Sequence, residues 1–370
     1  MRKNGSTASS LATVVLFSET CEESVRWKRL KTLRPSSSPT SLPPLLGEDD
    51  DLILDEDEKV AVLNEFFSRV AKTFDSSRFR QDHFEGVLEA LTRNAAAFLP
   101  STASEAGENG SICEEEVRAC MQSLKLSKAS GPDTIPAELI KHGGSGMCQS
   151  LTWMFNRSWD MGYLPLDWRT AHITPVPKES HARTPDRFHP ISLLYVASKV
   201  METVVKGRLE SLAERGEWFS GFQGAYRKNR NSTDQLLYMS QRVHDEFERG
   251  KVGVVALIDV AKAYDCLWRE GLLHTLLRRG VQGKMLAWIR AFLSDRRACV
   301  ATRSARSPYL YHETGIPQGS VLSPIFFNIF MAGFFQVLSA AELSIFADDV
   351  RIMSFSDDPG TAVVNVNAQL

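Results

Sequence analysis

The sequence predicts an α+β or mixed α/β protein, because segments with helical periodicity alternate loosely with runs typical of strands. Three stretches carry this prediction. "VGVVALIDV" (252–260) is apolar and rich in β-branched residues, and "AYDCLWREGLLHTLLRRG" (263–280) places apolar residues four apart. "LSIFADDVRIM" (343–353) has two aspartates between apolar runs, as in a hairpin. With 43% hydrophobic residues, the chain of 370 residues can build a sizeable core.

The first part of the chain has the composition of a flexible leader. Residues 1–58 are rich in Ser and Pro and then turn acidic. Residues 59–110 begin with an amphipathic helix, "KVAVLNEFFSRVAKTF", and end in a linker. No clean small-residue cleavage site follows the short apolar run near the start, so we expect no signal peptide.

The middle of the chain, residues 112–250, is mostly helical in pattern. "EEEVRACMQSLKL", "SLTWMFNRSWDMGYLP" and "ISLLYVASKVMETVVKGRLESL" predict helices, and a turn at Gly131 and Pro132 precedes a short one. "AHITPVP" (171–177) predicts an extended segment that its prolines at 175 and 177 keep off a central strand.

From residue 251 onward strands become prominent. "VGVVALIDV" predicts a strand buried on both faces, and Gly280 ends the following helix. "GIPQGSVLSPIFFNIF" (315–330) predicts a Gly and Pro turn that opens an apolar helix. Pro324 and Asn328 interrupt this apolar run, which favours a buried helix over a membrane span, so no membrane partner is predicted.

The charge balance and the cysteines exclude some kinds of site. Lys plus Arg number 43 against 45 Asp plus Glu, and a net charge of -2 gives no global attraction to polyanions. Any site for nucleic acid is therefore local. The six cysteines form no CxxC pair, so we expect no zinc site, and reduced thiols favour an intracellular protein, nuclear or cytoplasmic and not secreted.

Three aspartates carry the predicted chemistry. Asp348 and Asp349 alone would be ordinary turn residues, but Asp259 ends an apolar strand, where an uncompensated charge is costly. If that strand lies beside the hairpin, three carboxylates converge and require a cation. Mg²⁺ is the natural candidate, as two ions that serve phosphoryl transfer, with Mn²⁺ as a substitute. The spacing alone leaves nucleases, cyclases and polymerases open.

A resemblance narrows this choice. "ALIDVAKAYD" (256–265), "GIPQGSVLSP" (315–324) and "FADD" (346–349) resemble, in order and spacing, the palm motifs of reverse transcriptases. Upstream, "SKASGPDTIPAELIK", "PVPK", "HPISLLYVASKVME" and "FQGAYRKNRNSTDQLL" resemble segments of non-LTR (LINE-type) retrotransposons. The similarity runs from about Glu114 to Met353. A group II intron or retron type is the alternative, which "GPDTIPAELIK" and "STDQLL" disfavour.

The resemblance implies a right-hand polymerase. Residues 112–250 would form a fingers-like region and residues 251–370 the palm, with no thumb because the chain ends soon after "FADD". The implied activity is RNA-directed DNA synthesis, with an RNA template, a DNA primer and deoxynucleoside triphosphates as partners. A catalytically inert fragment with residual nucleic-acid binding is the alternative, and the oligomeric state stays open.

The resemblance also assigns the catalytic residues. Asp259 and Asp348 would be the main metal ligands, and Asp349 would complete the acidic cluster. Tyr264 would lie under the sugar and clash with a ribonucleotide 2′-hydroxyl, although it could simply pack the helix start. Gln318 and Gly319 of "PQGS" would lie against the incoming nucleotide, where glycine permits close backbone approach, although they could merely cap the next helix.

Basic residues complete the implied site. Lys178 would face the triphosphate, and Arg227, Lys228 and Arg230 would contact template phosphates, unless they form an ordinary solvated charge run. His189 stands where the family usually has arginine, so nucleotide binding should be weaker. Further candidates for phosphate contact are Arg296, Arg297, Arg303 and Arg306.

Overall fold

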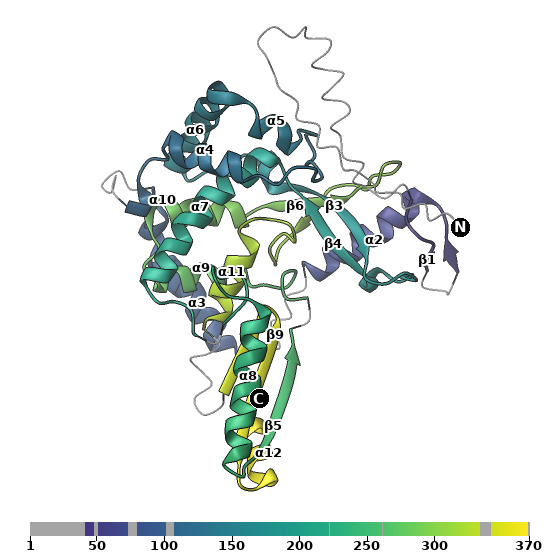
Figure 1. Cartoon of the computed structure of the whole chain (residues 1–370). Coiled ribbons are helices and arrows are strands. Elements are labelled where there is room, and N and C mark those ends of the chain that lie inside the picture. The colour runs from purple at the N-terminus through teal and green to yellow at the C-terminus, as the bar shows by residue number, and fades with distance from the viewer. Residues whose placement is uncertain are drawn as a thin grey trace, which may run out of the picture.

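Three β-sheets organise the part of the chain that the computed structural model describes, and helices surround them (Figure 1). One sheet pairs β1 with β2, a second has the strand order β4-β3-β6-β7, and a third has the order β5-β9-β8. In Figure 1 the third sheet lies below the second, with α8 and α12 beside it. The described residues are 41–47, 51–72, 80–100, 107–221, 223–260, 262–333 and 342–368.

The N-terminal region corrects the predicted leader. β1 (Leu45–Leu46) and β2 (Leu52–Ile53) pair antiparallel, and α2 (Glu56–Val70) follows, with the Asp55 side chain accepting from the backbone N–H of Glu58 at 3.0 Å. The prediction of a flexible leader is therefore wrong for residues 41–47 and 51–58. The apolar residues of this segment pack with α2 and the four-stranded sheet. This burial offsets the conformational entropy that the segment loses when it becomes ordered. Residues 1–40 lie outside the described residues.

Helices dominate the next stretch, as predicted. α6 (Gly144–Met161) ends at Gly162, whose φ of 56° is the left-handed conformation typical of a helix C-terminus. The elements before the second sheet are α3 (Gln81–Arg93), η2 (Ala95–Phe98), η3 (Gly107–Asn109), α4 (Glu114–Ser123), α5 (Ala137–Lys141), α6 and η4 (Leu166–Arg169). α4 begins at Glu114, where its sequence pattern places it, whereas α6 begins before its predicted segment, which starts at Ser150.

The four-stranded sheet shows where prolines are tolerated. β3 (Thr170–Pro177) pairs antiparallel with β4 (Phe188–Leu193) along its length, but parallel with β6 (Arg296–Val300) only over its first four residues. The prediction that the prolines keep this segment off a central strand is wrong for that first half. Both prolines lie beyond the end of the β6 pairing, where no N–H is needed.

Other elements of this region differ from the sequence patterns. Residues 191–193 belong to β4, preceded by η5 (Pro185–Arg187), and the predicted helix begins later as α7 (Val196–Arg215). Pairing with β3 holds these residues extended, so tertiary contacts override the helical periodicity. β7 (Leu310–His312) adds the last strand of the sheet.

The three-stranded sheet carries the predicted hairpin. β8 (Glu342–Phe346) and β9 (Asp349–Ser356) form it, and β5 (Val252–Asp259) pairs antiparallel with β9. The strand prediction for β5 is confirmed, but burial on both faces is wrong. β5 lies at the sheet edge, and one of its faces leaves Leu257 75% exposed. α8 (Ser232–Glu248) and α12 (Pro359–Asn367) contact this sheet.

The main hydrophobic core joins this sheet to the helices. Ile345, Val350 and Ile352 of the hairpin share one buried cluster with α9 (Arg269–Arg278), α10 (Gly283–Leu293) and α11 (Ser323–Met331). α11 is short and buried, which confirms the buried helix predicted for the apolar run. Among the described helices, none combines the length and the apolar character that crossing a bilayer requires.

Candidate active site

The hairpin turn brings the three predicted aspartates to one end of the sheet. Phe346 and Asp349 are the last paired residues of the hairpin, and Ala347, at φ 57°, and Asp348 form the turn between them. Asp259 is the Cα partner of Asp349, and the backbone N–H of Val260 donates to the carbonyl of Asp348 at 3.4 Å. The expectation that the strand ending in Asp259 lies beside the hairpin is confirmed.

A cavity of about 560 Å³ opens at this end of the sheet. Asp259 and Asp348 line it, whereas Asp349 does not. Among the described residues no group of three His, Cys, Asp or Glu is arranged to hold a metal ion, and the metal-ligand roles of Asp259, Asp348 and Asp349 stay a prediction. Two carboxylates still fit Mg²⁺, because this ion usually binds one or two of them together with substrate phosphates.

Tyr264 forms part of the cavity wall near these aspartates. Its ring stacks on Phe327 of α11, with centroids 5.3 Å apart and planes inclined by 19°. Burial raises the pKa of the Tyr264 phenol, and a hydrogen bond with Tyr226 and the negative charge of Asp348 raise it further. The phenol is therefore protonated at neutral pH. Tyr264 thus both packs against a helix and faces the cavity, which reconciles the two roles that its sequence allows.

The "PQGS" loop lies against two other parts of the chain. Gly315 has φ 76°, and a Cβ there would lie 2.3 Å from the carbonyl oxygen of Asp265. Gly319 has φ 122°, and a Cβ there would lie 2.6 Å from the carbonyl oxygen of Ser192 in β4. The N–H of Ser192 also donates to the carbonyl of Gln318 at 2.6 Å. Both glycines therefore permit close approach to the protein's own backbone, and the approach of this loop to a nucleotide stays a prediction.

A buried glutamate that sequence reasoning missed holds the next part of the loop. Glu202 of α7 is fully buried and accepts hydrogen bonds from the Ser320 hydroxyl at 2.6 Å and from the Val321 N–H at 2.8 Å. The only sequence signal is an acidic residue inside an apolar stripe of a helix, next to Val204 and Val205. Such a residue needs a partner when it is buried, so it could have been predicted as a polar anchor.

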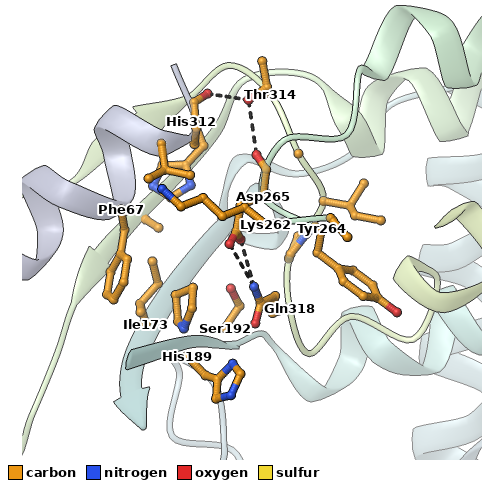
Figure 2. Close-up of a pocket in the computed structure, with 18 of the residues that line it drawn as sticks. Phe67, Ile173, His189, Ser192, Lys262, Tyr264, Asp265, His312, Thr314 and Gln318 are labelled. Carbon is orange, nitrogen blue, oxygen red and sulfur yellow. Dashed lines mark hydrogen bonds between the residues drawn. The ribbon is translucent and has the colours of Figure 1, made fainter. Parts of the chain in front are cut away.

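Asp265 is a second site residue that was missed. The side-chain amide nitrogen of Gln318 donates to both carboxylate oxygens of Asp265, at 3.0 Å each (Figure 2). Burial raises the pKa of Asp265 to about 6, although the Gln318 hydrogen bond and the charges of Lys262 and Lys178 oppose the rise. Asp265 is the last residue of "ALIDVAKAYD", so its place in the motif was the available signal.

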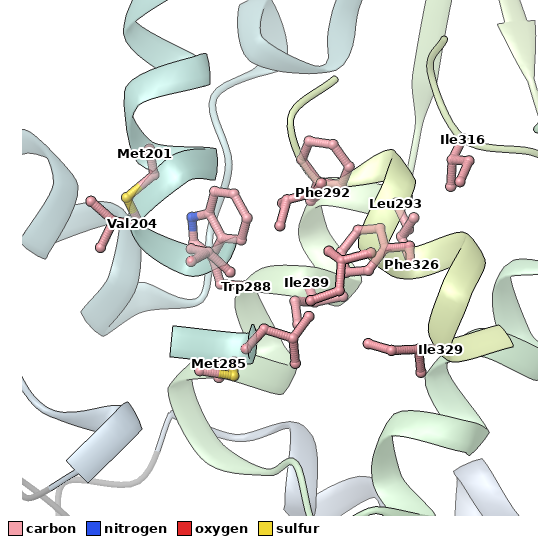
Figure 3. Close-up of a cluster of buried hydrophobic side chains, with 14 of the residues drawn as sticks. Met201, Val204, Met285, Trp288, Ile289, Phe292, Leu293, Ile316, Phe326 and Ile329 are labelled. Atoms are coloured by element: carbon pink, nitrogen blue, oxygen red, sulfur yellow. The ribbon is translucent and has the colours of Figure 1, made fainter. Parts of the chain in front are cut away.

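Aromatic packing holds α11, the helix that follows the "PQGS" loop, against α10. Figure 3 shows Phe326 and Ile329 of α11 facing Phe292 of α10. The rings of Phe292 and Phe326 are 6.0 Å apart, and Trp288 stacks on Phe292 at 5.7 Å. Because α11 follows the "PQGS" loop directly, this packing fixes the end of the loop.

Residues 176–368 match the family model described as "Reverse transcriptase (RNA-dependent DNA polymerase)". The chain belongs to this reverse transcriptase family. The matched range contains the aspartates, the "PQGS" loop and the β3–β4 turn, whereas the part of the cavity wall formed by α2 and the start of β3 lies outside it.

Related reverse transcriptases come from non-LTR mobile elements, which confirms the LINE-type assignment. The chain is 28% identical over 277 residues to the RNA-directed DNA polymerase from mobile element jockey of Drosophila melanogaster, covering 75% of this chain and 30% of that protein. A probable RNA-directed DNA polymerase from transposon BS, also from Drosophila melanogaster, is 23% identical over 340 residues, covering 90% and 36%. The putative 115 kDa protein in element R1DM of the same organism is 28% identical over 275 residues, covering 71% and 26%. The chain thus spans about a third of these relatives or less.

A solved structure of apo telomerase from Candida tropicalis, truncated from the C-terminal domain, aligns with this chain at a TM-score of 0.39 and 12% identity. The alignment covers 55% of this chain and 46% of that chain. Family membership rests on the sequence match, because a likeness of this degree is too small to carry it.

The β3–β4 turn brings two predicted nucleotide contacts to the same cavity. Lys178 and His189 both line it, and His189 lies opposite Val176 in the strand pair. The Lys178 ammonium donates to the carbonyl of Asp186 at 2.8 Å, which orients it. The two side chains therefore lie on the wall contributed by β3 and β4, and their contact with a triphosphate stays a prediction.

The predicted nucleic-acid cluster is only partly on the surface of the chain. Arg227 donates to the carbonyls of Ser220 and Gln223 and forms an ion pair with Glu214 at 3.4 Å, so its guanidinium is used inside the protein. Lys228 and Arg230 are exposed. Of the further candidates, Arg303 and Arg306 are exposed and Arg296 is buried, which rules out its contact with a nucleic-acid backbone at the surface.

Proposed function

We propose that the chain is the fingers and palm part of an RNA-directed DNA polymerase that adds deoxynucleotides to a primer 3′-hydroxyl opposite an RNA template. One observation carries the proposal: Asp259 and Asp348, on neighbouring segments of one sheet end, line the same cavity as the "PQGS" loop. The cavity volume of about 560 Å³ is that of a small-molecule site.

The reaction assigns a task to each carboxylate. The primer 3′-oxygen attacks the α-phosphorus, the bond from that phosphorus to the β-phosphate oxygen breaks, pyrophosphate leaves, and the hydroxyl proton passes to solvent. Two Mg²⁺ ions, or Mn²⁺ in their place, would activate the attacking hydroxyl and stabilise the leaving oxygen. Asp259 and Asp348 would hold them, and Asp349 lies beside Asp259 as a further negative charge.

Other residues on the cavity wall select and orient the nucleotide. The Tyr264 ring, stacked on Phe327, is a rigid surface for the sugar and leaves no room for a 2′-hydroxyl. Lys178 and His189 bind the triphosphate from the β3–β4 side, and Gln318 is presented by a loop that Asp265 and Ser192 hold in place. Lys228 and Arg230 bind template phosphates.

The similarity to proteins described as RNA-directed DNA polymerases supports this proposal. The division into fingers at 112–250 and palm at 251–370, and an intracellular location, belong to the same proposal.

Primer extension tests the proposed function. The folded chain should extend a DNA primer on an RNA template with Mg²⁺ and labelled deoxynucleotides, and Asp348→Asn should abolish the incorporation. Asp357→Asn is the matched control, because Asp357 is an exposed aspartate just after the same hairpin. Incorporation that survives in Asp348→Asn contradicts the assignment of the site. No incorporation by folded wild-type chain supports the inert nucleic-acid-binding fragment instead.

A further inference from the structure

The cavity extends beyond the part that the proposed reaction uses. The end that we call the rear compartment is lined by Phe67 and Ala71 of α2, Arg269 of α9, Arg296 of β6, and His312 and Thr314 at and after β7. Figure 2 shows His312, Thr314 and Phe67 at one side of the cavity, His189 and Gln318 at the other, and Lys262 between them.

Two residues that line the rear compartment each have a buried polar atom without a hydrogen-bond partner among the described residues. Arg296 is only 3% exposed, and its Nη1 donates to the carbonyl of Phe292 at 2.9 Å, but its Nη2 makes no hydrogen bond with any described residue. The Nε2 atom of His312 is also buried without a partner in the described chain. Buried polar groups without partners are rare and costly, so they indicate a missing ligand.

The charge of the compartment points to an anion. Arg269 is 7% exposed and donates to the carbonyls of Thr314 and Gly315, which are neutral acceptors. Burial lowers the pKa of Arg296 to about 9, and the neighbouring charges of Arg269 and Arg169 lower it further while Glu202 opposes them. Arginine at this pKa is still charged at pH 7. Two buried, charged guanidinium groups therefore line the same cavity.

Neither Arg269 nor Arg296 forms an ion pair with a carboxylate among the described residues. Glu202 acts on Arg296 from a greater distance, and Glu270, Asp295 and Glu313 act likewise on Arg269. The oxygens of Glu202 accept from Ser320, Val321 and Ser198, and the carboxylate of Asp265 points to Gln318 rather than to His312 (Figure 2). Burial, together with the nearby positive charges, lowers the pKa of His312 to about 4, so its ring is neutral and adds a hydrogen bond without a charge. An anion would satisfy both the charges and the unpaired donors.

We propose that the rear compartment binds inorganic pyrophosphate, the leaving group of the proposed nucleotidyl transfer. Guanidinium groups bind phosphate oxygens in a forked geometry, which suits the free Nη2 of Arg296. The compartment belongs to the same cavity as Asp259 and Asp348, where pyrophosphate would form. This inference rests on the proposed function for its choice of ligand.

Burial of the walls favours a small anion over a nucleic-acid backbone. Ala171, Ile173 and Ala298 line the cavity near the arginines and are each less than 5% exposed. A polynucleotide needs an open groove along which its backbone can run, whereas pyrophosphate can enter a closed end. Lys262 and Lys178 line the path between the two ends with positive charge.

Isothermal titration of pyrophosphate into the wild-type chain, with EDTA and without nucleotide or primer, tests this site. We expect one pyrophosphate per chain and at least tenfold weaker binding of sulfate. Arg296→Met keeps much of the buried side chain and removes the guanidinium, and it should weaken pyrophosphate binding at least tenfold. Arg303→Met is the matched control, because this arginine is exposed in the same β6–β7 segment and does not line the cavity.

A milder variant covers the case in which Arg296→Met does not fold. Arg296→Lys keeps the charge but removes the fork, and it should weaken binding several-fold. The inference is overturned if the folded wild type does not bind pyrophosphate, if sulfate binds equally well, or if every folded Arg296 variant binds like wild type.

The two proposals fail separately. Asp348→Asn should abolish primer extension without weakening pyrophosphate binding in EDTA, because it removes a negative charge from the cavity wall. A chain that binds pyrophosphate through Arg296 but never extends a primer contradicts the proposed function and leaves the anion site standing. A chain that extends primers but binds no pyrophosphate contradicts the anion site alone.

Discussion

The side-chain amide of Gln318 is held by Asp265, whose two carboxylate oxygens both accept from the same nitrogen at 3.0 Å. This contact joins the segment after β5 to the loop before α11. Asp265 therefore fixes the orientation of the residue that the family resemblance places against the nucleotide. Because Asp265 occupies the side-chain nitrogen of Gln318, the amide oxygen is the atom of this side chain that can accept a hydrogen bond from another group.

Replacing Asp265 by asparagine should impair nucleotide binding more than chemistry. The amide of the new side chain cannot offer two oxygens to Gln318, so the loop loses one orienting contact. We expect the KM for deoxynucleotides to rise by about tenfold, a factor that corresponds to about 1.4 kcal/mol. Steady-state primer extension measures it, with Asp357→Asn as the control. A fall in kcat at unchanged KM would contradict this positioning role.

Asp265 also predicts a pH dependence of stability. Its folded pKa of about 6 lies above the ordinary value of 3.8, so the protonated carboxyl is favoured in the folded protein. The stability from this group is fully present below pH 3.8 and is lost as pH rises through 6, by about 3 kcal/mol at most.

Urea unfolding at pH 4.5 to 7 measures this effect. The free energy of unfolding of the wild type, minus that of Asp265→Asn, should fall as pH rises, because asparagine does not titrate. A difference that is constant across the range, or that rises with pH, would show that Asp265 does not titrate in this way.

Truncation of Glu202 should loosen the "PQGS" loop from α7. Glu202→Ala leaves the Ser320 hydroxyl and the Val321 N–H buried without an acceptor, which costs about 3 kcal/mol. Glu202→Gln should cost less, since its amide oxygen still accepts. The control is Glu210→Ala on the same helix, where a more exposed ion pair with Lys206 is worth less than about 1 kcal/mol. Equal losses for the two alanine variants, by chemical unfolding, would contradict the anchor.

Gly315 and Gly250 form a matched pair for the close approach of the loop. Both have φ 76°, but a Cβ at Gly315 would lie 2.3 Å from the Asp265 carbonyl oxygen, whereas a Cβ at Gly250 meets nothing within 4 Å. Gly250→Ala should cost about 1 kcal/mol, from backbone strain alone. Gly315→Ala should cost clearly more by thermal or urea unfolding, because the backbone must move. Similar costs at the two sites would show that the contact with Asp265 is not tight.

His189→Arg should strengthen nucleotide binding. His189 lines the cavity opposite Val176, so an arginine there adds a permanent forked charge next to Lys178. We expect the KM for deoxynucleotides to fall several-fold in primer extension. His181→Arg is the control, because His181 is exposed between the same strands and does not line the cavity. An unchanged KM for His189→Arg, or an equal fall in the control, would refute this role.

The sequence predicted the parts of the site that carry strong local signals. Asp259 follows an apolar strand, and the Asp348–Asp349 pair interrupts two apolar runs, so hairpin and strand pairing could be predicted. The place of Asp349 outside the cavity could not, because it depends on how the turn at Ala347 directs each side chain.

Contacts distant in sequence explain what was missed. The approach of α7 to the loop decides the role of Glu202, and no local pattern reveals it. The burial of β5 was overestimated because an apolar strand at the edge of a sheet can have the same sequence pattern as an apolar strand in the middle of a sheet. Arg296 resembled a surface charge in sequence, and only the packing of β6 against α10 makes it part of a cavity wall.

β5 forms one edge of the three-stranded sheet, and this edge could pair with another polypeptide in solution. Within the described residues this strand hydrogen-bonds to β9 alone, which leaves the backbone groups on its other side open to a further strand. Leu257 and Val255 are exposed and add an apolar surface beside these unpaired backbone groups. A polypeptide that extends the sheet there would run past Asp259, so the same binding event would also shield the Asp259 carboxylate from water.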